Sequence, residues 1–296
     1  MAIQSTSVQS WRIGEMTVSK VVDMIEPFDA ARAYPEADLA EFDRHLDWLT
    51  PYFYDPAQRA IILSFHSYVV KAAGKVIVVD TCIGEHKNIP MLPSWHQRTG
   101  PWLANLAAAG VVPEQVTHVM CTHLHGDHVG WNTRLENGRW VPTFPNARYI
   151  VHKDELAAVQ ARVGDDPYTS PSYAESVLPV LYAKQVDLVA TDHEFLPGVH
   201  VRPTPGHSPG HYCVELASAG RRAVMTGDLI HNPVQIARPD WITTFCTDKQ
   251  AAVAQRTRFI DAHADQDVTI FAAHFGGPTA GRIASRAGAR RFQVLT

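Results

Sequence analysis

Residues 122–128 read Thr-His-Leu-His-Gly-Asp-His, so three imidazoles and a carboxylate lie within six positions. On a loop, this spacing can turn His123 and His125 toward one cation and the Asp-His pair that follows toward a second. Gly126 would allow the backbone to bend closely around them. Neutral imidazole and carboxylate are ligands that suit zinc, manganese or iron. A chance match to this pattern is on the order of a few in a thousand, so a metal-binding loop is a better interpretation than a solvated polar loop.

The chain around this motif alternates groups of predicted strands with single helices. Runs rich in β-branched residues predict strands over 17–23, 61–71, 76–80, 116–121, 148–152, 199–203, 212–216, 223–226 and 268–273. Helices are predicted over 101–109, 154–163, 173–184 and 249–264. This alternation favours two β-sheets covered by helices over one parallel sheet.

Polar clusters follow four of these strands, and three of the clusters come after the first motif. His207 lies in the Pro- and Gly-rich loop 204–211, Asp228 lies in a Thr-Gly-Asp sequence, and His274 ends the strand at 268–273. A lone histidine is weak support for a metal site, but these three all occur where a strand stops. Strand ends converge at one edge of a sheet, and a carboxylate has two oxygens with which to bridge two cations. We therefore expect these residues to join the motif in one site.

Taken together, these residues resemble the metallo-β-lactamase fold hydrolases, over about 200 residues and in the same order along the chain. The resemblance implies one domain over residues 1–296, an α/β fold with two mixed β-sheets flanked by helices in a four-layer αβ/βα sandwich. It implies that one metal is held by His123, His125 and His207, the second by Asp127, His128 and His274, and that Asp228 bridges them.

Two further residues near the motifs are assigned through the same resemblance. Asp80 resembles the family's aspartate that supports the motif loop from outside the metal shell, although Cys82 stands where a glycine is commoner. His211 is expected to be structural or to support a ligand from outside the metal shell, and it is not counted as a ligand.

The implied cofactors are two Zn²⁺ ions, with Mn²⁺ or Fe²⁺ as alternatives. Two such cations lower the pKa of a bridging water toward neutrality, which would give a hydroxide nucleophile at pH 7. Asp127 and Asp228 are the expected catalytic residues: Asp228 by joining the metals, and Asp127 by passing a proton to the leaving group. The closest resemblance is to the branch that contains N-acyl homoserine lactonases, pyridoxolactonase and methyl-parathion-type hydrolases, which implies a lactonase or esterase.

Other activities stay open at this point. Organophosphate triester hydrolysis, glyoxalase-II-like thioester hydrolysis and an iron persulfide dioxygenase use related ligand patterns. Asp228 argues against the β-lactamases that carry Cys at the bridging position, and His125 against flavodiiron-type oxidoreductases, which usually carry Glu there. A metal-stabilised binding protein is the non-catalytic alternative, but a structural zinc site closes with four ligands, fewer than the seven found here.

Aromatic side chains suggest where an apolar substrate could bind. The long segment 25–59 contains seven aromatic residues and is interpreted as a lid or partner surface, with packing over the core as an equal alternative. Trp131, Phe65, Trp241, Phe245 and the run 52–54 are candidates for an acyl or aryl pocket, and core packing is again the alternative for each. His66 could line the site or satisfy the core.

Composition limits the remaining choices. The 296 residues are 46% hydrophobic, which allows a full core, and a net charge of −4 gives no basic stripe for nucleic acid. Residues 1–16 lack the apolar stretch of a secretory signal, and no run of about 18 apolar residues predicts a membrane span. Four scattered cysteines form no Cys-x-x-Cys pair. We expect a cytoplasmic enzyme with a small-molecule partner, an apolar lactone or ester, and no nucleic-acid or membrane partner; a homodimer stays open.

Overall fold

The computed structural model describes residues 8–286 and 288–295, so the N-terminal stretch 1–16 is described from residue 8 onward. The chain divides into two compact units. Unit 1 contains the described part of Met1–Met24 together with Phe65–Ala190, and unit 2 contains Ile25–Ser64 together with the described part of Thr191–Thr296. The chain passes from one unit to the other inside two long strands and once more after Ala190. Neither unit is therefore a continuous piece of sequence.

The first sheet has the order β1-β2-β4-β5-β6-β9-β10, with β3 paired to β4. Its strands are β1 (Gln9–Ile13), β2 (Met16–Asp29), β3 (Tyr54–Asp55), β4 (Ala60–Ala72), β5 (Lys75–Val79), β6 (His118–Met120), β9 (Arg148–His152) and β10 (Val186–Val189). β5, β6, β9 and β10 run parallel, whereas β1 with β2 and β4 with β5 are antiparallel. The parallel strands bring the carboxyl ends of β5 and β6 to the same edge, where the first motif begins.

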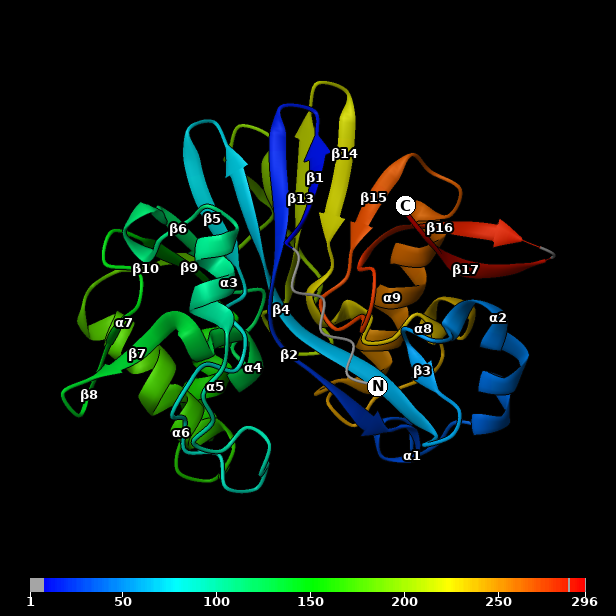
Figure 1. Cartoon of the computed structure of the whole chain (residues 1–296), viewed down its shortest axis with the longest axis horizontal. Coiled ribbons are helices and arrows are strands. Elements are labelled where there is room, and N and C mark those ends of the chain that lie inside the picture. The colour runs from blue at the N-terminus through cyan, green and yellow to red at the C-terminus, as the bar shows by residue number, and fades with distance from the viewer. Residues whose placement is uncertain (1–7, 287, 296) are drawn as a thin grey trace. The chain divides into compact units, whose positions relative to one another are not determined.

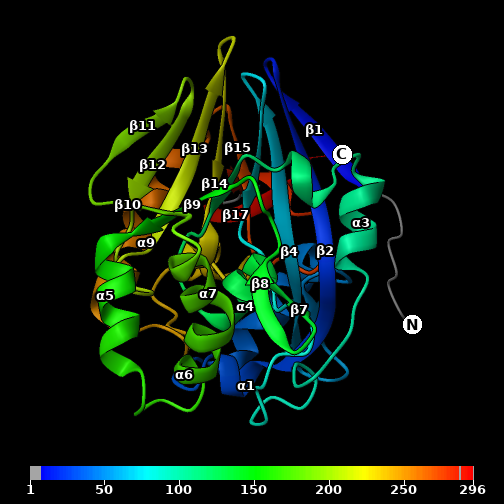
Figure 2. The same ribbon diagram turned by 90° about the vertical axis from the view of Figure 1, so that its left-hand side faces the viewer.

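Unit 1 places helices and a small hairpin around these strands (Figure 2). They are α3 (Trp102–Ala108), η2 (Pro113–Gln115), α4 (Gly126–Val129), η3 (Gly130–Asn132), α5 (Lys153–Arg162), α6 (Thr169–Ser172), the π-helical turn η4 (Tyr173–Val177), α7 (Leu178–Tyr182), and the hairpin β7 (Thr133–Glu136) with β8 (Arg139–Pro142). In the core, Trp102 stacks on Trp131 with ring centroids 5.4 Å apart, and its indole N–H donates to Ser67 Oγ at 3.1 Å. Trp131 is 2% exposed. Core packing, not a pocket, is therefore its role.

Unit 2 contains the second sheet, whose strands lie in sequence order β11 to β17. Figure 1 labels β13 to β17, and Figure 2 labels β11 and β12. They are β11 (His193–Leu196), β12 (Val199–Pro203), β13 (Tyr212–Ser218), β14 (Arg221–Met225), β15 (Val268–Phe271), β16 (Ala280–Arg286) and β17 (Ala289–Val294). The helices are α1 (Ala30–Ala33), η1 (Leu39–His45), α2 (Leu46–Leu49), η5 (Gly227–Leu229), α8 (Val234–Ala237) and α9 (Lys249–His263). β14 and β15 are parallel and the other neighbours antiparallel. The mixed sheets flanked by helices confirm the predicted fold class.

The aromatic segment 25–59 supplies much of the core of unit 2. Phe42 stacks on Tyr54 with centroids 4.2 Å apart and meets Trp241 at 5.4 Å. Tyr34 and Phe53 are also buried, whereas Tyr52 is 42% exposed. The packing alternative therefore describes most of these rings, and Trp241 belongs to the same core and not to a pocket.

Most predicted elements are present, and the differences have local causes. Strands 148–152 and 199–203 match β9 and β12, and the helix predicted at 249–264 is α9, which begins after an Asp248 side chain that accepts from Ala251 N. The helix predicted at 173–184 is instead a π-helical turn followed by α7, because Pro179 lacks the N–H that a continuous helix needs. Among the described residues, no helix combines the length and apolarity required to cross a bilayer.

Candidate metal centre

The motif loop of unit 1 follows β6 and is held by the side chain of Asp80, the residue after β5. Asp80 Oδ1 accepts from Thr122 N at 2.8 Å, and its Oδ2 accepts from Thr122 Oγ1 at 2.8 Å and contacts His128 Nδ1 at 2.9 Å. One buried carboxylate therefore fixes both ends of the motif. This is the supporting role predicted for Asp80 outside the metal shell.

Three other hydrogen bonds hold the backbone between these ends. Leu124 N donates to Glu155 Oε1 at 3.1 Å, Gly126 N to Tyr168 Oη at 3.0 Å, and Thr81 N to His128 O at 2.7 Å. Each bond uses a backbone group that would otherwise be buried without a partner. The loop is thus tied to the residues after β5, to α5 and to the turn before α6.

This support selects which atoms of the motif are presented as ligands. With Nδ1 of His128 against Asp80, the ring turns Nε2 toward Asp127, whose Oδ2 lies 3.6 Å away. His123 similarly has Nδ1 3.2 Å from Thr122 Oγ1. The ring centroid of His123 lies 4.5 Å from that of His125 and 4.0 Å from that of His128. An imidazole oriented through one nitrogen by a carboxylate or hydroxyl is typical of a metal ligand that binds through the other.

Cys82 occupies a left-handed backbone conformation, with φ of +53°. Such a conformation costs a residue with a Cβ more than it costs glycine, which explains why glycine is commoner there. The thiol is buried, contacts Ser67 Oγ at 3.3 Å, and the Cys82 carbonyl accepts from Gly130 N at 2.8 Å. These contacts keep the strained turn in place after Asp80.

In unit 2, the side chain of Asp228 lies among three imidazoles. Its Oδ2 is 3.3 Å from His207 Nε2 and 3.3 Å from His231 Nε2, and its Oδ1 is 3.0 Å from His274 Nε2. All four side chains are buried. A buried carboxylate and the imidazoles around it form a donor set that suits zinc. The ionised carboxylate and the neutral imidazole are the forms that coordinate the ion.

His211 supports this cluster from behind. Its Nε2 accepts from Asp228 N at 2.9 Å, so the proton is on Nδ1, which lies 2.8 Å from Thr204 Oγ1 and 3.2 Å from Thr204 O. Both ring nitrogens are used within unit 2. This agrees with the prediction that His211 is structural and not a ligand.

The loop that carries His207 is packed tightly on the start of α9. Gly206 has φ of +144°, and a Cβ there would lie 2.5 Å from Ala252 N and 2.7 Å from its Cα. Thr247 N donates to the His207 carbonyl at 2.8 Å, and Cys246 Sγ lies 3.7 Å from His207 Nδ1. Only glycine allows this approach, so the Gly-His pair fixes the imidazole against α9.

Sequence reasoning missed two residues of these clusters. His231 follows Asp228 by three residues across the single turn η5, and its Nδ1 has no hydrogen-bond partner in the part of the chain that the structure describes. Burial lowers the pKa of His231 despite the neighbouring carboxylate of Asp228. The i,i+3 spacing was the signal available for His231, whereas nothing in the sequence links Tyr168 to a motif some forty residues earlier.

The other candidate residues lie in their own units. Phe65 meets Trp95 edge-on at 5.0 Å, and His66 meets Tyr68 at 5.0 Å in unit 1. Phe245 contacts the His231 ring at 5.6 Å in unit 2, beside the Asp228 cluster. Phe245 is therefore a pocket candidate that lies beside the Asp228 cluster.

Replacing Asp80 tests the support of the motif loop. In Asp80→Ala, His128 loses the contact that orients its ring and Thr122 N is left buried without its acceptor. We expect zinc affinity and kcat/KM each to fall by about 10- to 100-fold. Zinc competition with a chromogenic chelator and steady-state kinetics measure the two effects. Asp187→Ala, which removes an exposed carboxylate bonded to Arg148 in the same unit, is the matched control; equal losses in both variants would contradict the assignment.

Comparison with known proteins gives a consistent result. A model described as the metallo-beta-lactamase superfamily matches residues 65–274. An N-acyl homoserine lactonase from Bacillus cereus is 34% identical over 106 residues, which are 36% of this chain and 35% of that protein. The lactonase AiiB from Agrobacterium fabrum (strain C58) is 24% identical over 181 residues, 55% of this chain and 61% of the relative. The chain thus spans about a third to three fifths of the length of these curated relatives.

Solved structures resemble the chain over nearly its whole length. The crystal structure of hydrolase AbOPH in the beta lactamase superfamily has a TM-score of 0.82 and 23% identity, and covers 99% of both chains. AidC, described as a dizinc quorum-quenching lactonase in complex with a product, has a TM-score of 0.80 and 20% identity over 98% of both. At these identities the likeness is one of fold.

Proposed function

Because this chain belongs to the metallo-β-lactamase superfamily, we propose that it is a binuclear metal-dependent hydrolase of lactones or of carboxylic and aryl esters. The observation that carries the proposal is the burial of the Asp228 side chain among imidazoles. The side chain is a buried carboxylate with both oxygens within 3.0 to 3.3 Å of imidazole nitrogens. Burial of a carboxylate is costly unless charge or hydrogen bonds compensate it, and cations would do so here.

The donor residues fit two metal ions. Unit 1 offers His123, His125, Asp127 and His128 on one supported loop, and unit 2 offers His207, Asp228 and His274. We propose that both sets serve the same pair of ions, since the superfamily match includes all seven residues. When bound, two zinc ions would supply an activated water and polarise the ester carbonyl. Asp228 would bridge the ions, and Asp127 would move a proton to the leaving oxygen.

The proposed substrate is an apolar lactone or ester. Phe245, which is half-buried beside His231 in unit 2, offers a ring surface for an acyl or aryl group. Apolar walls with a few polar groups are typical of small-molecule sites. The relatives named as lactonases support the same substrate class.

The two units are proposed to act as one metallo-β-lactamase domain. β2 and β4 run through both units, and the superfamily match begins at residue 65 in one and ends at residue 274 in the other. Within the segment 25–59, the ring of Tyr52 is exposed and those of Phe28 and Trp48 are half-buried, so a lid function would rest on these three residues. A homodimer stays a prediction.

A substrate panel with metal analysis tests the function. We expect close to two zinc ions per chain, and turnover of acyl homoserine lactones or aryl esters ahead of paraoxon-type triesters, S-lactoylglutathione and a β-lactam. Metal-stripped protein should be inactive and should recover with added zinc. A single iron per chain with activity confined to oxygen-consuming assays would contradict the proposal, as would hydrolysis of S-lactoylglutathione alone.

A further inference from the structure

Tyr168 lies against the motif loop in unit 1 and makes two hydrogen bonds with consecutive residues. Its Oη accepts from Gly126 N at 3.0 Å and donates to Asp127 Oδ1 at 3.2 Å. The other oxygen of the same carboxylate, Oδ2, lies 3.6 Å from His128 Nε2. The two oxygens of Asp127 thus have different surroundings, one against a phenol and the other beside an imidazole that is a proposed ligand.

The backbone of Tyr168 is fixed on both sides by the turn before α6. Asp166 Oδ1 accepts from Tyr168 N at 2.9 Å, its Oδ2 accepts from Thr169 Oγ1 at 2.6 Å, and Ser172 Oγ donates to Tyr168 O at 2.9 Å. Burial alone would raise the pKa of Asp166, but the bonds from Thr169, Tyr168 N and Arg162 lower it to about 2. The turn is therefore held by a charged cap at neutral pH, and the phenol has little freedom to move.

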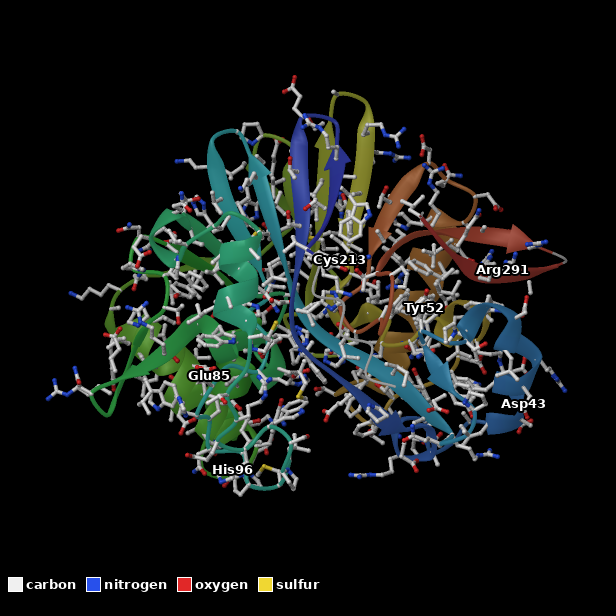
Figure 3. The ribbon with its side chains drawn as sticks, in the orientation of Figure 1. Asp43, Tyr52, Glu85, His96, Cys213 and Arg291 are labelled. Carbon is white, nitrogen blue, oxygen red and sulfur yellow. The ribbon has the colours of Figure 1, made fainter. Side chains whose placement is uncertain are left out.

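The side chain of Tyr168 is also held by its neighbours. Trp95, which is 9% exposed, has its ring centroid 6.4 Å from that of Tyr168 and 5.0 Å from that of Phe65. Trp95 lies in the loop between β5 and α3, where Figure 3 labels Glu85 and His96. That loop is closed by Gly100 N donating to Glu85 Oε1 at 2.8 Å and Ile89 N to His96 Nδ1 at 3.1 Å.

The absence of a side chain at Gly126 also allows Tyr168 to lie against the motif loop. A Cβ at residue 126 would lie 2.6 Å from Ser172 Oγ and 3.0 Å from Tyr168 Oη. A larger residue would push the phenol away from the loop. The glycine of the motif is therefore required here for close approach of Tyr168, in addition to any need for a tight bend.

We propose that Tyr168 is a positioning residue, whose hydroxyl holds Oδ1 of Asp127 so that Oδ2 faces His128 Nε2, where the two side chains would hold a metal together. The role rests on the proposed hydrolase function and deepens it. In ester or lactone cleavage the acyl C–O bond breaks, its electron pair goes to the leaving oxygen, and the proton lost by the attacking water must reach that oxygen. Asp127 is the proposed carrier of this proton, so its orientation matters most when the leaving oxygen is strongly basic.

The leaving group therefore provides a sharp test with Tyr168→Phe, which removes one hydroxyl. A lactone expels an alkoxide that needs the proton, whereas a 4-nitrophenyl ester expels a stable phenolate that does not. We expect kcat for a γ-lactone to fall about tenfold or more while kcat for the 4-nitrophenyl ester falls less than about threefold, with KM little changed. Zinc affinity, measured by chelator competition without substrate, should fall about tenfold for one of the two ions.

Tyr173→Phe is the matched control, since Tyr173 accepts from Gln160 Nε2 at 3.0 Å and does not contact the motif loop in any bond described here. It should match wild type in all three measurements. If Tyr168→Phe is unstable by circular dichroism, Gly126→Ala gives a second route, because it displaces the phenol, and should produce the same loss of lactone over aryl ester turnover.

The outcomes separate this inference from the function itself. Wild-type protein that turns over neither ester nor lactone refutes the proposed function, and the zinc competition still tests Tyr168. Active wild type together with Tyr168→Phe that has unchanged zinc affinity and an equal effect on both substrates overturns the positioning role.

Discussion

Asp228→Ala is expected to lower turnover by roughly three to five powers of ten and to leave fewer than two zinc ions on the protein. The reason is geometric: one side chain meets His207, His231 and His274 within 3.3 Å, so its removal takes away the group that joins the donors of unit 2. Elemental analysis after desalting and steady-state kinetics on the best substrate of the panel measure the two effects. The fold should survive, since the side chain contributes little apolar surface, although thermal stability should drop through lost metal binding.

Two variants in unit 2 serve as controls for this result. Asp240→Ala removes an exposed carboxylate paired with Arg238 and should match wild type. His211→Ala removes the acceptor of Asp228 N and should keep both metals with a smaller loss of rate than Asp228→Ala. The bridging assignment is wrong if Asp228→Ala retains two metals and near-normal rates while His211→Ala loses them.

Arg256→Met is expected to cost about 3 kcal/mol of the free energy of unfolding. Arg256 projects from α9, is 1% exposed, and donates to Pro239 O at 2.9 Å, Trp241 O at 2.6 Å and Leu229 O at 3.4 Å. Burial lowers its pKa from the usual arginine value. Methionine can fill the space of the aliphatic stem but donates nothing, so the Pro239 carbonyl would be left without the donor described here.

Urea denaturation followed by circular dichroism measures this loss. Arg258→Met is the matched control, because Arg258 is exposed on the same helix and the change removes the same charge. We expect a change within about 0.5 kcal/mol for Arg258→Met. A comparable loss in both variants would assign the effect to helix charge and not to the buried carbonyls.

The motif residues could be predicted from sequence because their chemistry and their spacing coincide. Three histidines and an aspartate in six positions indicate a metal-binding loop by themselves. Each of the later donors follows a run rich in β-branched residues, which predicts a strand. Asp80 could be placed through the same logic, at the end of the strand before the motif. The structure confirms that it holds Thr122 and His128.

The supporting residues could not be predicted, for physical reasons. Tyr168 reaches Gly126 and Asp127 through the fold of α5 and α6, and no local pattern encodes a contact made across that distance. The sequence of 25–59 does not show whether its aromatic residues form a lid or a core. The same residue types occur in both, and only their exposure in the fold differs. Packing partners such as Trp241, far along the chain, decide between them.

The discontinuous course of the chain has a consequence for how the protein is made. A ribosome releases the N-terminus first, so unit 1, including the loop 122–128, has all its residues once synthesis has reached Ala190. Ile25–Ser64 must wait for Thr191 and the residues after it before their aromatic core can close, which is a long-range closure and slow to form. During that interval Tyr34 and Phe42 lack Trp241, and Phe53 lacks Phe275. We therefore expect this segment to reach its native packing only after the residues from Thr191 onward have emerged.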